Sequence, residues 1–390
     1  MRKQLLTLCL AAVAVIGCRR TQHETGAMVE LPSGSFTTAW RAEPPMQRSD
    51  SVKSLHLTDD TLYVYTQHNR VISIGTSGGK MNWTAQVAGD ADILRKPLVV
   101  KDRVIFPTAS TFKIFSKAGQ NIRTMDIGHN MRSAAAVEGE DLYVGLDYSR
   151  GGRLAKIDST REFSATRWEL MTSAGVSAAP VFFGETVYCA GEDGSVYAIN
   201  ENRAPVWSLP NNVFKTDGRI LADLQVDDYG VYVASTDSKL YVLDRMTGKI
   251  RWQYFAGTAL LDSPTVTADS VYEYVPNQGL TAIDKSTGAY NRKARWVSGD
   301  AKQFLAADEK YVYVALRDRR IAALDKVTGE IKFTSERRDL SVFAPNTKTG
   351  ILYAATADGL VLAIKPITKP GTVGEMVRGE LELEVIASAQ

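Results

Sequence analysis

The sequence predicts an all-β protein, an eight-bladed β-propeller with four-stranded blades whose last blade is closed by the N-terminal strand. Three observations lead to this prediction. One pattern recurs eight times at spacings of 40 to 44 residues, most copies contain four short alternating runs, and the strand that the last copy lacks is found near the N-terminus. Units of about 40 to 45 residues with four strands each are typical of propeller blades.

The first 34 residues are typical of a targeting signal followed by a tether, rather than of a part of the folded domain. A short basic start precedes a largely apolar run over residues 5–17, which is too short to span a bilayer and is typical of a secretory signal. The run ends Ile16-Gly17-Cys18, which resembles the lipobox of bacterial lipoproteins. We therefore expect a lipoprotein signal peptide over 1–17, lipidation of Cys18, and a lipidated polar tether over 18–34. The alternative is an ordinary signal peptide with an incidental cysteine.

The repeat is marked by an apolar residue just before a turn. These anchor residues are Ile74, Phe115, Ile157, Ile199, Leu243, Ile283, Leu324 and Ile364. An aromatic residue lies 9 to 14 positions before each anchor and is a second mark of the same register. The second marks are Tyr63, Phe106, Tyr143, Tyr188, Tyr232, Tyr272, Tyr313 and Tyr353. Two marks that agree in eight copies indicate one repeated structural unit.

The unit around Leu243 shows the four strands most clearly. Its alternating runs of apolar, aromatic and β-branched residues cover 221–226, 231–234, 240–243 and 250–253. Turn chemistry follows at 244–248, where an aspartate can cap the turn and a glycine can take a positive φ. We interpret the recurring Asp158, Asp244, Asp284 and Asp325 as such turn residues rather than as metal ligands or catalytic acids. No helix periodicity is found from residue 35 to residue 367.

The two ends of the repeat region predict how the ring closes. The eighth unit, residues 341–367, offers three strands and lacks the outer strand that carries a tryptophan. An orphan strand over 36–41 ends with Trp40-Arg41 and can supply it, which leaves no open sheet edge at the seam. We expect the propeller to cover 35–367 and a C-terminal tail to cover 368–390, with one more strand possible over 380–386.

Tryptophans recur in the outer strands and predict contacts between blades. Trp83, Trp207 and Trp252 lie 8 or 9 residues after their anchors, and Trp40 ends the closing strand. Because each sheet buries its face against the next, we assign these four side chains to blade-to-blade packing. A ligand-binding role for them is the alternative.

Composition and charge weigh against several classes of function. The chain has 46 Lys+Arg against 44 Asp+Glu, so nothing favours a nucleic-acid partner. Its four histidines are scattered, and three cysteines leave little room for a zinc site or for disulfides. We therefore expect no metal, no cofactor and no catalytic residue.

The repeat Leu-Asp-x-x-Thr-Gly-x-x-x-Trp resembles the blades of the quinoprotein alcohol dehydrogenase-like (PQQ-like) superfamily, over about 330 of the 390 residues. In that superfamily such tryptophans and glycines dock neighbouring blades. One branch consists of quinone-dependent dehydrogenases, many of which carry an adjacent cysteine pair over the cofactor. This chain has no such pair and no cytochrome motif. A dehydrogenase is therefore the less favoured alternative.

The other branch is the BamB family, lipoprotein subunits of the machine that assembles outer-membrane β-barrels. This chain resembles it in length, lipobox, tether, eight blades and the closing strand. The resemblance implies a non-catalytic scaffold, lipid-anchored in the outer membrane and facing the periplasm, that holds the barrel-forming subunit, with nascent outer-membrane proteins as a further class of partner. The alternative is a propeller lipoprotein that binds another envelope complex or a glycan.

The family's partner-docking loops correspond here to 169–172 and 216–221. The first lacks the family's leucine-arginine motif, and the second lacks its paired aspartates. Leu170, Met171, Arg219 and Leu221 are the replacements that keep apolar and basic character, and we take them as candidate partner-binding residues. Ordinary connections between blades are the alternative interpretation of both segments.

Overall fold

The computed structural model describes residues 30–31, 34–149, 151–162, 165–286, 293–368 and 371–372. The chain separates into two units, Gly34–Thr368 and residues 1–33 with 369–390. In the latter, β1 (Glu30–Leu31) pairs antiparallel with β34 (Gly371–Thr372), a pairing that the sequence had not indicated. Cys18, the signal peptide and the strand expected over 380–386 lie outside the described residues.

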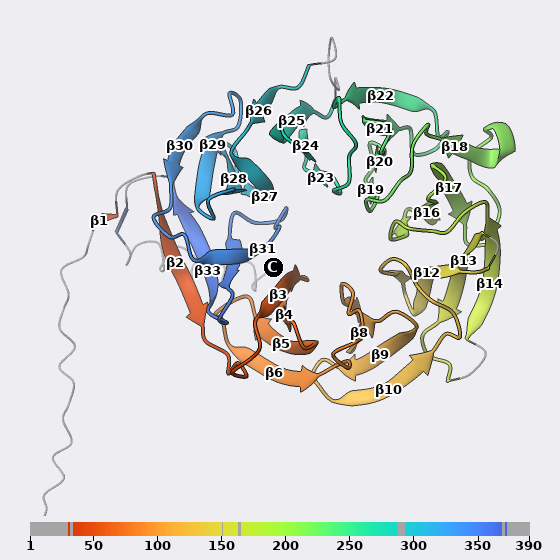
Figure 1. Cartoon of the computed structure of the whole chain (residues 1–390), viewed down its shortest axis with the longest axis horizontal. Coiled ribbons are helices and arrows are strands. Elements are labelled where there is room, and N and C mark those ends of the chain that lie inside the picture. Colours follow the sequence, from red (N-terminus) through yellow and green to blue (C-terminus); the bar gives the residue numbers. More distant parts are fainter. Residues whose placement is uncertain are drawn as a thin grey trace, which may run out of the picture. The chain divides into compact units, whose positions relative to one another are not determined.

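Eight antiparallel sheets of four strands form the unit Gly34–Thr368 and surround a central axis (Figure 1). This confirms the predicted fold class. In blades 1 to 7 the chain runs from the innermost strand to the outermost and then crosses to the next blade. The described residues contain no α-helix, and none belongs to a helix long and apolar enough to cross a membrane.

The strands of the first four blades are as follows. Blade 1 is β3 (Val52–Leu57), β4 (Thr61–Thr66), β5 (Arg70–Gly75) and β6 (Met81–Gln86). Blade 2 is β7 (Leu98–Val100), β8 (Arg103–Pro107), β9 (Thr111–Ser116) and β10 (Asn121–Asp126). Blade 3 is β11 (Ala136–Glu138), β12 (Asp141–Asp147), β13 (Gly152–Asp158) and β14 (Thr166–Thr172). Blade 4 is β15 (Val181–Phe183), β16 (Thr186–Ala190), β17 (Ser195–Asn200) and β18 (Val213–Lys215), with a 3₁₀ turn η1 (Pro210–Asn212) before β18.

The remaining blades follow the same plan. Blade 5 is β19 (Gln225–Val226), β20 (Val231–Ala234), β21 (Lys239–Leu243) and β22 (Ile250–Phe255). Blade 6 is β23 (Thr265–Val266), β24 (Ser270–Val275), β25 (Gly279–Asp284) and β26 (Trp296–Ser298). Blade 7 is β27 (Ala301–Ala307), β28 (Tyr311–Leu316), β29 (Ile321–Asp325) and β30 (Ile331–Thr334). Blade 8 is β31 (Leu340–Ala344), β32 (Leu352–Thr356), β33 (Val361–Ile367) and β2 (Ser35–Ala42).

The ring closes as predicted. Strand β2 is the outer strand of blade 8 and pairs antiparallel with β33, with Ser35 opposite Ile367 and Ala42 opposite Val361 (Figure 1). The first strand of blade 5 is shorter than expected, because only Gln225 and Val226 of the run 221–226 join the ladder. The residues before them are held by side chains instead: Ser177 Oγ donates to the Ile220 carbonyl over 2.5 Å, and Thr236 Oγ1 accepts from the Arg219 amide.

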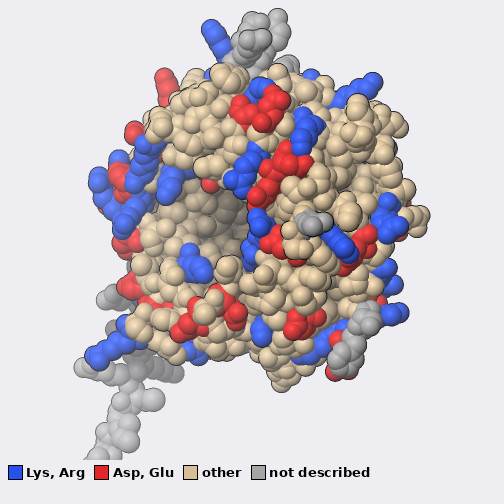
Figure 2. Space-filling view, turned by 45° about the vertical axis from the view of Figure 1, so that its right-hand side comes forward, with Lys and Arg blue, Asp and Glu red and all other residues tan. Residues whose placement is uncertain are grey.

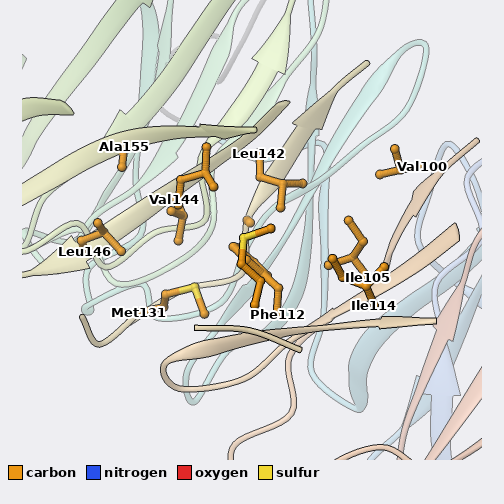
Figure 3. Packing of buried hydrophobic residues seen from close by; sticks show 12 residues of the cluster. Val100, Ile105, Phe112, Ile114, Met131, Leu142, Val144, Leu146 and Ala155 are labelled. Carbon is orange, nitrogen blue, oxygen red and sulfur yellow. The ribbon is translucent and has the colours of Figure 1, made fainter. Parts of the chain in front are cut away.

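The core consists of eight clusters of buried apolar side chains, one at each junction between neighbouring blades. The junction of blades 2 and 3 is an example: Phe112 and Ile114 of β9 pack with Leu142 and Val144 of β12, and Met131 lies beside them (Figure 3). Each blade therefore buries one face against the blade before it and the other against the blade after it. This division of the core explains why the two middle strands of a blade, such as β4 and β5, are buried on both faces.

A second contact joins the blades near their outer edges, from an outer strand in five blades and, in blade 4, from Trp207 in the segment before η1. All six tryptophans donate their indole N–H to a backbone carbonyl of the next blade, and each acceptor lies two residues after that blade's anchor. The donors Trp40, Trp83, Trp168, Trp207, Trp252 and Trp296 reach Thr76, Lys117, Glu201, Arg245, Lys285 and Lys326 over 2.7–3.1 Å. Among the described residues, turn glycines lie on the rings of Trp40, Trp83, Trp207 and Trp296; a Cβ on Gly119, whose φ is +83°, would fall 2.4 Å from Trp83 Cγ.

Two junctions lack a tryptophan and are joined differently. Arg123 lies opposite Ile114, the residue before an anchor, just as Trp83 lies opposite Ser73. Its guanidinium donates to the carbonyls of Ser159 and Arg161 in blade 3, so it takes over the indole's hydrogen bond. In blade 7 the same position holds Phe333, whose ring lies 5.1 Å from that of Phe36 in β2.

Replacement of Arg123 by alanine is expected to lower the free energy of unfolding by about 1–2 kcal/mol, because the hydrogen bonds of a charged donor to blade 3 are lost. Urea unfolding followed by tryptophan fluorescence measures this. Arg251→Ala is the matched control, since Arg251 pairs over 2.5 Å with Asp244 of its own blade and is exposed. The control is expected to change stability by less than about 1 kcal/mol. Equal effects of the two substitutions would contradict a role of Arg123 between blades.

Candidate docking site

We call the side of the propeller at which each outer strand leads to the next blade the crossover face. On blades 3, 4 and 5 it is formed by the end of β14, the β16–β17 turn and the segments 173–180 and 216–224. All four candidate partner-binding residues lie in this region. Figure 2 shows one side of the molecule hollowed near its middle, with basic and acidic side chains alternating beside the hollow.

The segment 169–172 is not a loop, so this expectation was wrong. It is the second half of β14, and Leu154 and Arg153 of β13 lie opposite Leu170 and Met171. The long partner strand β13 extends the outer strand to the edge of the face. Alternation then separates the two candidates: Leu170 packs on the core between blades 3 and 4, whereas Met171 is 70% exposed. Met171 is thus available to a partner and Leu170 supports the strand.

The segment 216–221 is a loop, and it is held firmly at both ends. Thr216 is buried and its hydroxyl donates to the Gly218 carbonyl over 2.7 Å, while Ile220 is fully buried between blades 4 and 5. Between these two fixed points Arg219 is exposed, and Leu221 just after them is half-buried. The structure therefore presents Arg219 on a rigid support, as binding sites require.

Arg219 belongs to a chain of ion pairs that crosses three blades. Its guanidinium pairs with Glu192 over 2.7 Å, Glu192 also pairs with Arg132, and Arg132 pairs with Asp147 over 2.6 Å. The Asp147 carboxylate, followed by Glu192, raises the pKa of Arg132. These pairs are exposed to water, so they position side chains and contribute little to stability.

A cavity of about 740 Å³ lies next to this network, on the outer side of blade 4. The chain leaves the blade after Trp207, turns through Pro210–Asn212 and returns as the three-residue strand β18, which leaves Leu209, Val213 and Phe214 as an apolar wall. Sequence reasoning missed this cavity. Its only signal was the longest anchor spacing, 44 residues between Ile199 and Leu243.

One end of the cavity is polar. Asp193 accepts hydrogen bonds from Lys215 over 2.7 Å, Ser195 over 2.9 Å and Ser173 over 2.5 Å. Burial would raise the pKa of Asp193, but these hydrogen bonds outweigh it and lower the pKa to about 2. The Asp193 carboxylate is therefore charged, and it accepts hydrogen bonds from residues of its own blade and from Ser173. In the described part of the chain no three His, Cys, Asp or Glu side chains come together as metal ligands.

The fold and the repeated indole contact define a β-propeller of the PQQ-like repeat class. A family model described as outer membrane protein assembly factor BamB matches residues 28–128, 108–254, 201–301 and 277–369. The chain belongs to the family of the outer-membrane assembly factor BamB, as the resemblance of the repeat had implied.

Solved structures share the fold. BamB from Moraxella catarrhalis is similar with a TM-score of 0.64 and 19% identity, over 85% of this chain and 97% of that chain. The computationally designed Ika8 protein has a TM-score of 0.60 at 14% identity, over 81% of this chain and 96% of its own. The C-terminal WD40 domain of Sif2 has a TM-score of 0.62 at 9% identity, over 85% and 99%. No curated protein matches the sequence.

Proposed function

We propose that this protein is a non-catalytic scaffold of outer-membrane β-barrel assembly, which binds the barrel-forming subunit through the crossover face of blades 3 to 5. Membership of the BamB family supports the assembly role. The observation that carries the docking surface is the pair Met171 and Arg219, an exposed apolar side chain and an exposed cation on rigid supports in neighbouring blades. Exposed apolar side chains and arginines are the residue types enriched at protein interfaces.

We further propose that Cys18 carries the lipid and that the propeller faces the periplasm from the outer membrane. The lipobox and the polar tether 18–34 support this proposal. The propeller would cover 35–367, and nascent outer-membrane proteins are a second class of partner. Mass spectrometry of the purified lipoprotein tests the anchor: a diacylglyceryl mass on Cys18 is expected, and an unmodified Cys18 in the membrane fraction would contradict it.

The double variant Met171→Glu/Arg219→Glu is expected to reduce capture of the barrel-forming subunit at least about tenfold, because it replaces an apolar and a cationic contact by two anions. The measurement is a pull-down of the tagged lipoprotein from its own envelope in mild detergent, with partners quantified by mass spectrometry.

The matched control is Ile122→Glu/Arg317→Glu. Ile122 is 51% exposed on the outer strand of blade 2, and Arg317 is exposed on blade 7, so the same charges change away from the proposed surface. We expect the control to capture the subunit like the parent. Equal capture by both variants would contradict docking at blades 3 to 5, and reproducible capture of another envelope complex alone would contradict the assembly role.

A further inference from the structure

The centre of the propeller contains a cavity that the proposed docking role does not use. It has a volume of about 360 Å³ and is lined by side chains of β3, β19, β23 and the end of β31, together with the segment before β7. These strands are the innermost strands of blades 1, 5, 6 and 8 (Figure 1). Because blades 1 and 5 are on opposite sides of an eight-bladed ring, the cavity lies on the axis. Its volume is in the range of small-molecule sites.

The polar lining of this axial cavity consists of hydrogen-bond donors and basic groups. The residues are His56, Lys96, Gln225, Ser263, Thr265 and Thr347. No carboxylate lines it. Lys96 is exposed, lines the cavity, and makes no ion pair or hydrogen bond within the described part of the chain. Oxyanion sites usually combine a cation that has no counter-ion with several hydroxyl and amide donors, and this cavity has that composition.

The imidazole of His56 is held in place at the wall of the cavity. One ring nitrogen, Nε2, shares a hydrogen bond of 3.0 Å with Ser54 Oγ, and the ring lies 4.5 Å from that of Tyr65. Burial, followed by the charge of Lys96, lowers the pKa of His56 to about 4. The ring is therefore neutral at pH 7, and the positive potential of the cavity comes from Lys96.

Among the described residues no carboxylate forms an ion pair with Lys96. Arg95, the preceding residue, donates to the Met131 carbonyl, and its buried Nε has no acceptor within the described residues. Burial lowers the pKa of Arg95, and the charge of the Asp223 carboxylate opposes this shift. Asp223 itself accepts a hydrogen bond from the Ala179 amide over 2.7 Å. A second cavity of about 380 Å³ shares Ser263, Thr265 and Pro345 with the axial cavity and holds one cation, Lys302, and one carboxylate, Asp262.

We propose that the axial cavity binds a small free oxyanion, a phosphate or a compact carboxylate, with Lys96 as its cationic partner and Gln225, Ser263, Thr265 and Thr347 as hydrogen-bond donors. The inference goes beyond the docking role and does not depend on it. A bound anion would offset the charge of Lys96 at His56 and would favour the protonated imidazole. The pKa of His56 is therefore a measure of anion binding at this site.

The test is a pH titration of the histidine ring protons by NMR, on the lipoprotein without its anchor, in sodium chloride and then in inorganic phosphate or citrate at constant ionic strength. The chain has only four histidines, so the spectrum is simple, and His56→Asn assigns the signal. We expect the pKa of His56 to rise from about 4, with a saturable dependence on the concentration of the anion. His68, which is exposed and pairs with Asp90, should not respond.

Two variants separate a built site from general attraction of anions. Lys96→Gln should abolish the saturable response, and Lys53→Gln, an exposed lysine of the same strand as His56 that does not line the cavity, should leave it intact. The proposal is overturned if neither anion shifts the pKa of His56, or if the two lysine variants respond alike. A response to anionic lipid vesicles but to neither free anion would also overturn it.

Discussion

Replacement of Trp207, which lies between β17 and η1, by alanine is expected to lower the free energy of unfolding by about 4 kcal/mol, the largest loss we expect from any of the six tryptophans. Trp207 is 1% exposed, and its ring packs 6.0 Å from that of Tyr188. Its indole N–H donates to the Arg245 carbonyl of blade 5 over 2.9 Å. Truncation therefore leaves a cavity at this junction and removes the shorter of the two hydrogen bonds to the Arg245 carbonyl, the other being donated by the Tyr188 hydroxyl over 3.3 Å.

The turn of blade 5 already lies close to the Trp207 ring, so the junction cannot close over the space that the missing indole leaves. A Cβ on Gly248, whose φ is +70°, would fall 2.5 Å from Cδ2 of the indole, so the turn of blade 5 already touches the ring. Such a turn cannot move inward without strain, and the space of the missing indole stays partly empty.

Urea unfolding followed by circular dichroism measures the loss. Trp207→Phe keeps much of the packing but loses the hydrogen bond, and we expect it to cost about 1–2 kcal/mol. Trp252→Ala is the matched control, because Trp252 makes the same contact over 3.0 Å but is only partly buried. We expect a smaller loss for it than for Trp207→Ala. A loss below about 1 kcal/mol for Trp207→Ala would show that the indole does not hold blades 4 and 5 together.

Replacement of Glu273 by valine is expected to stabilise the protein at pH 7 by about 1–3 kcal/mol. Glu273 is fully buried, and neither carboxylate oxygen has a hydrogen-bond partner within the described residues. Val271 and Val275, on the same face of β24, pack with Leu240 and Leu260 of blade 5. The carboxyl group is thus placed in an apolar junction.

The repeat itself supplies the comparison for this position. The equivalent residues of the other seven blades, judged from strand register, are Val64, Phe106, Val144, Cys189, Val233, Val314 and Ala354. In blade 2 the register places Ile105, and not Phe106 as the sequence had indicated, at the position of the aromatic mark. All seven are apolar and 0% exposed. Valine is therefore a side chain that the blade already accommodates here, which makes the substitution a test of the carboxyl group rather than of packing.

The raised pKa of Glu273 determines how the stability of the parent protein changes with pH. Burial, followed by the charge of Asp262, raises the pKa of Glu273 well above its usual range. Because the folded state then holds a proton that the unfolded state releases, Glu273 makes the parent lose stability as pH rises above about 4.5. The stability difference between Glu273→Val and the parent should therefore grow between pH 5 and pH 8. Unfolding in urea at several pH values measures it.

Glu138→Gln, which changes an exposed carboxylate at the end of β11, is the control and should show no comparable trend. If Glu273→Val instead destabilised the protein at pH 7, the carboxylate would have a favourable partner in the folded protein, and the reasoning from burial would be wrong.

Much of the fold could be predicted because its signals are local and repeated. The anchors and the aromatic marks each lie within one blade, and eight copies made the register clear. The closing strand was predictable for a similar reason, since the last unit lacks a strand and residues 36–41 supply one. The candidate site was predicted less well. The segment 169–172 was expected to be a loop because the resemblance placed one of the family's docking loops there, whereas its strand pairing depends on the length of β13.

Three features could not be predicted because they depend on residues from different blades. Arg123 shows no sign in the sequence of replacing a tryptophan, and only its distance to two carbonyls of blade 3 reveals it. Glu273 stands between two tyrosines in an alternating strand, and the apolar surroundings on its side come from blade 5. The axial cavity gathers His56, Lys96 and Thr347 from three parts of the chain.

The family, the number of blades, the strand order and the closure follow from the amino-acid sequence, because alternation and turn chemistry are properties of neighbouring residues and eight repeats make both patterns easy to recognise. Which side chains are exposed to a partner follows from the folded structure alone. Met171 is exposed and Leu170 is not, and Arg219 is tied to Glu192, because strand register and the packing of adjacent blades orient side chains that consecutive residues alone cannot.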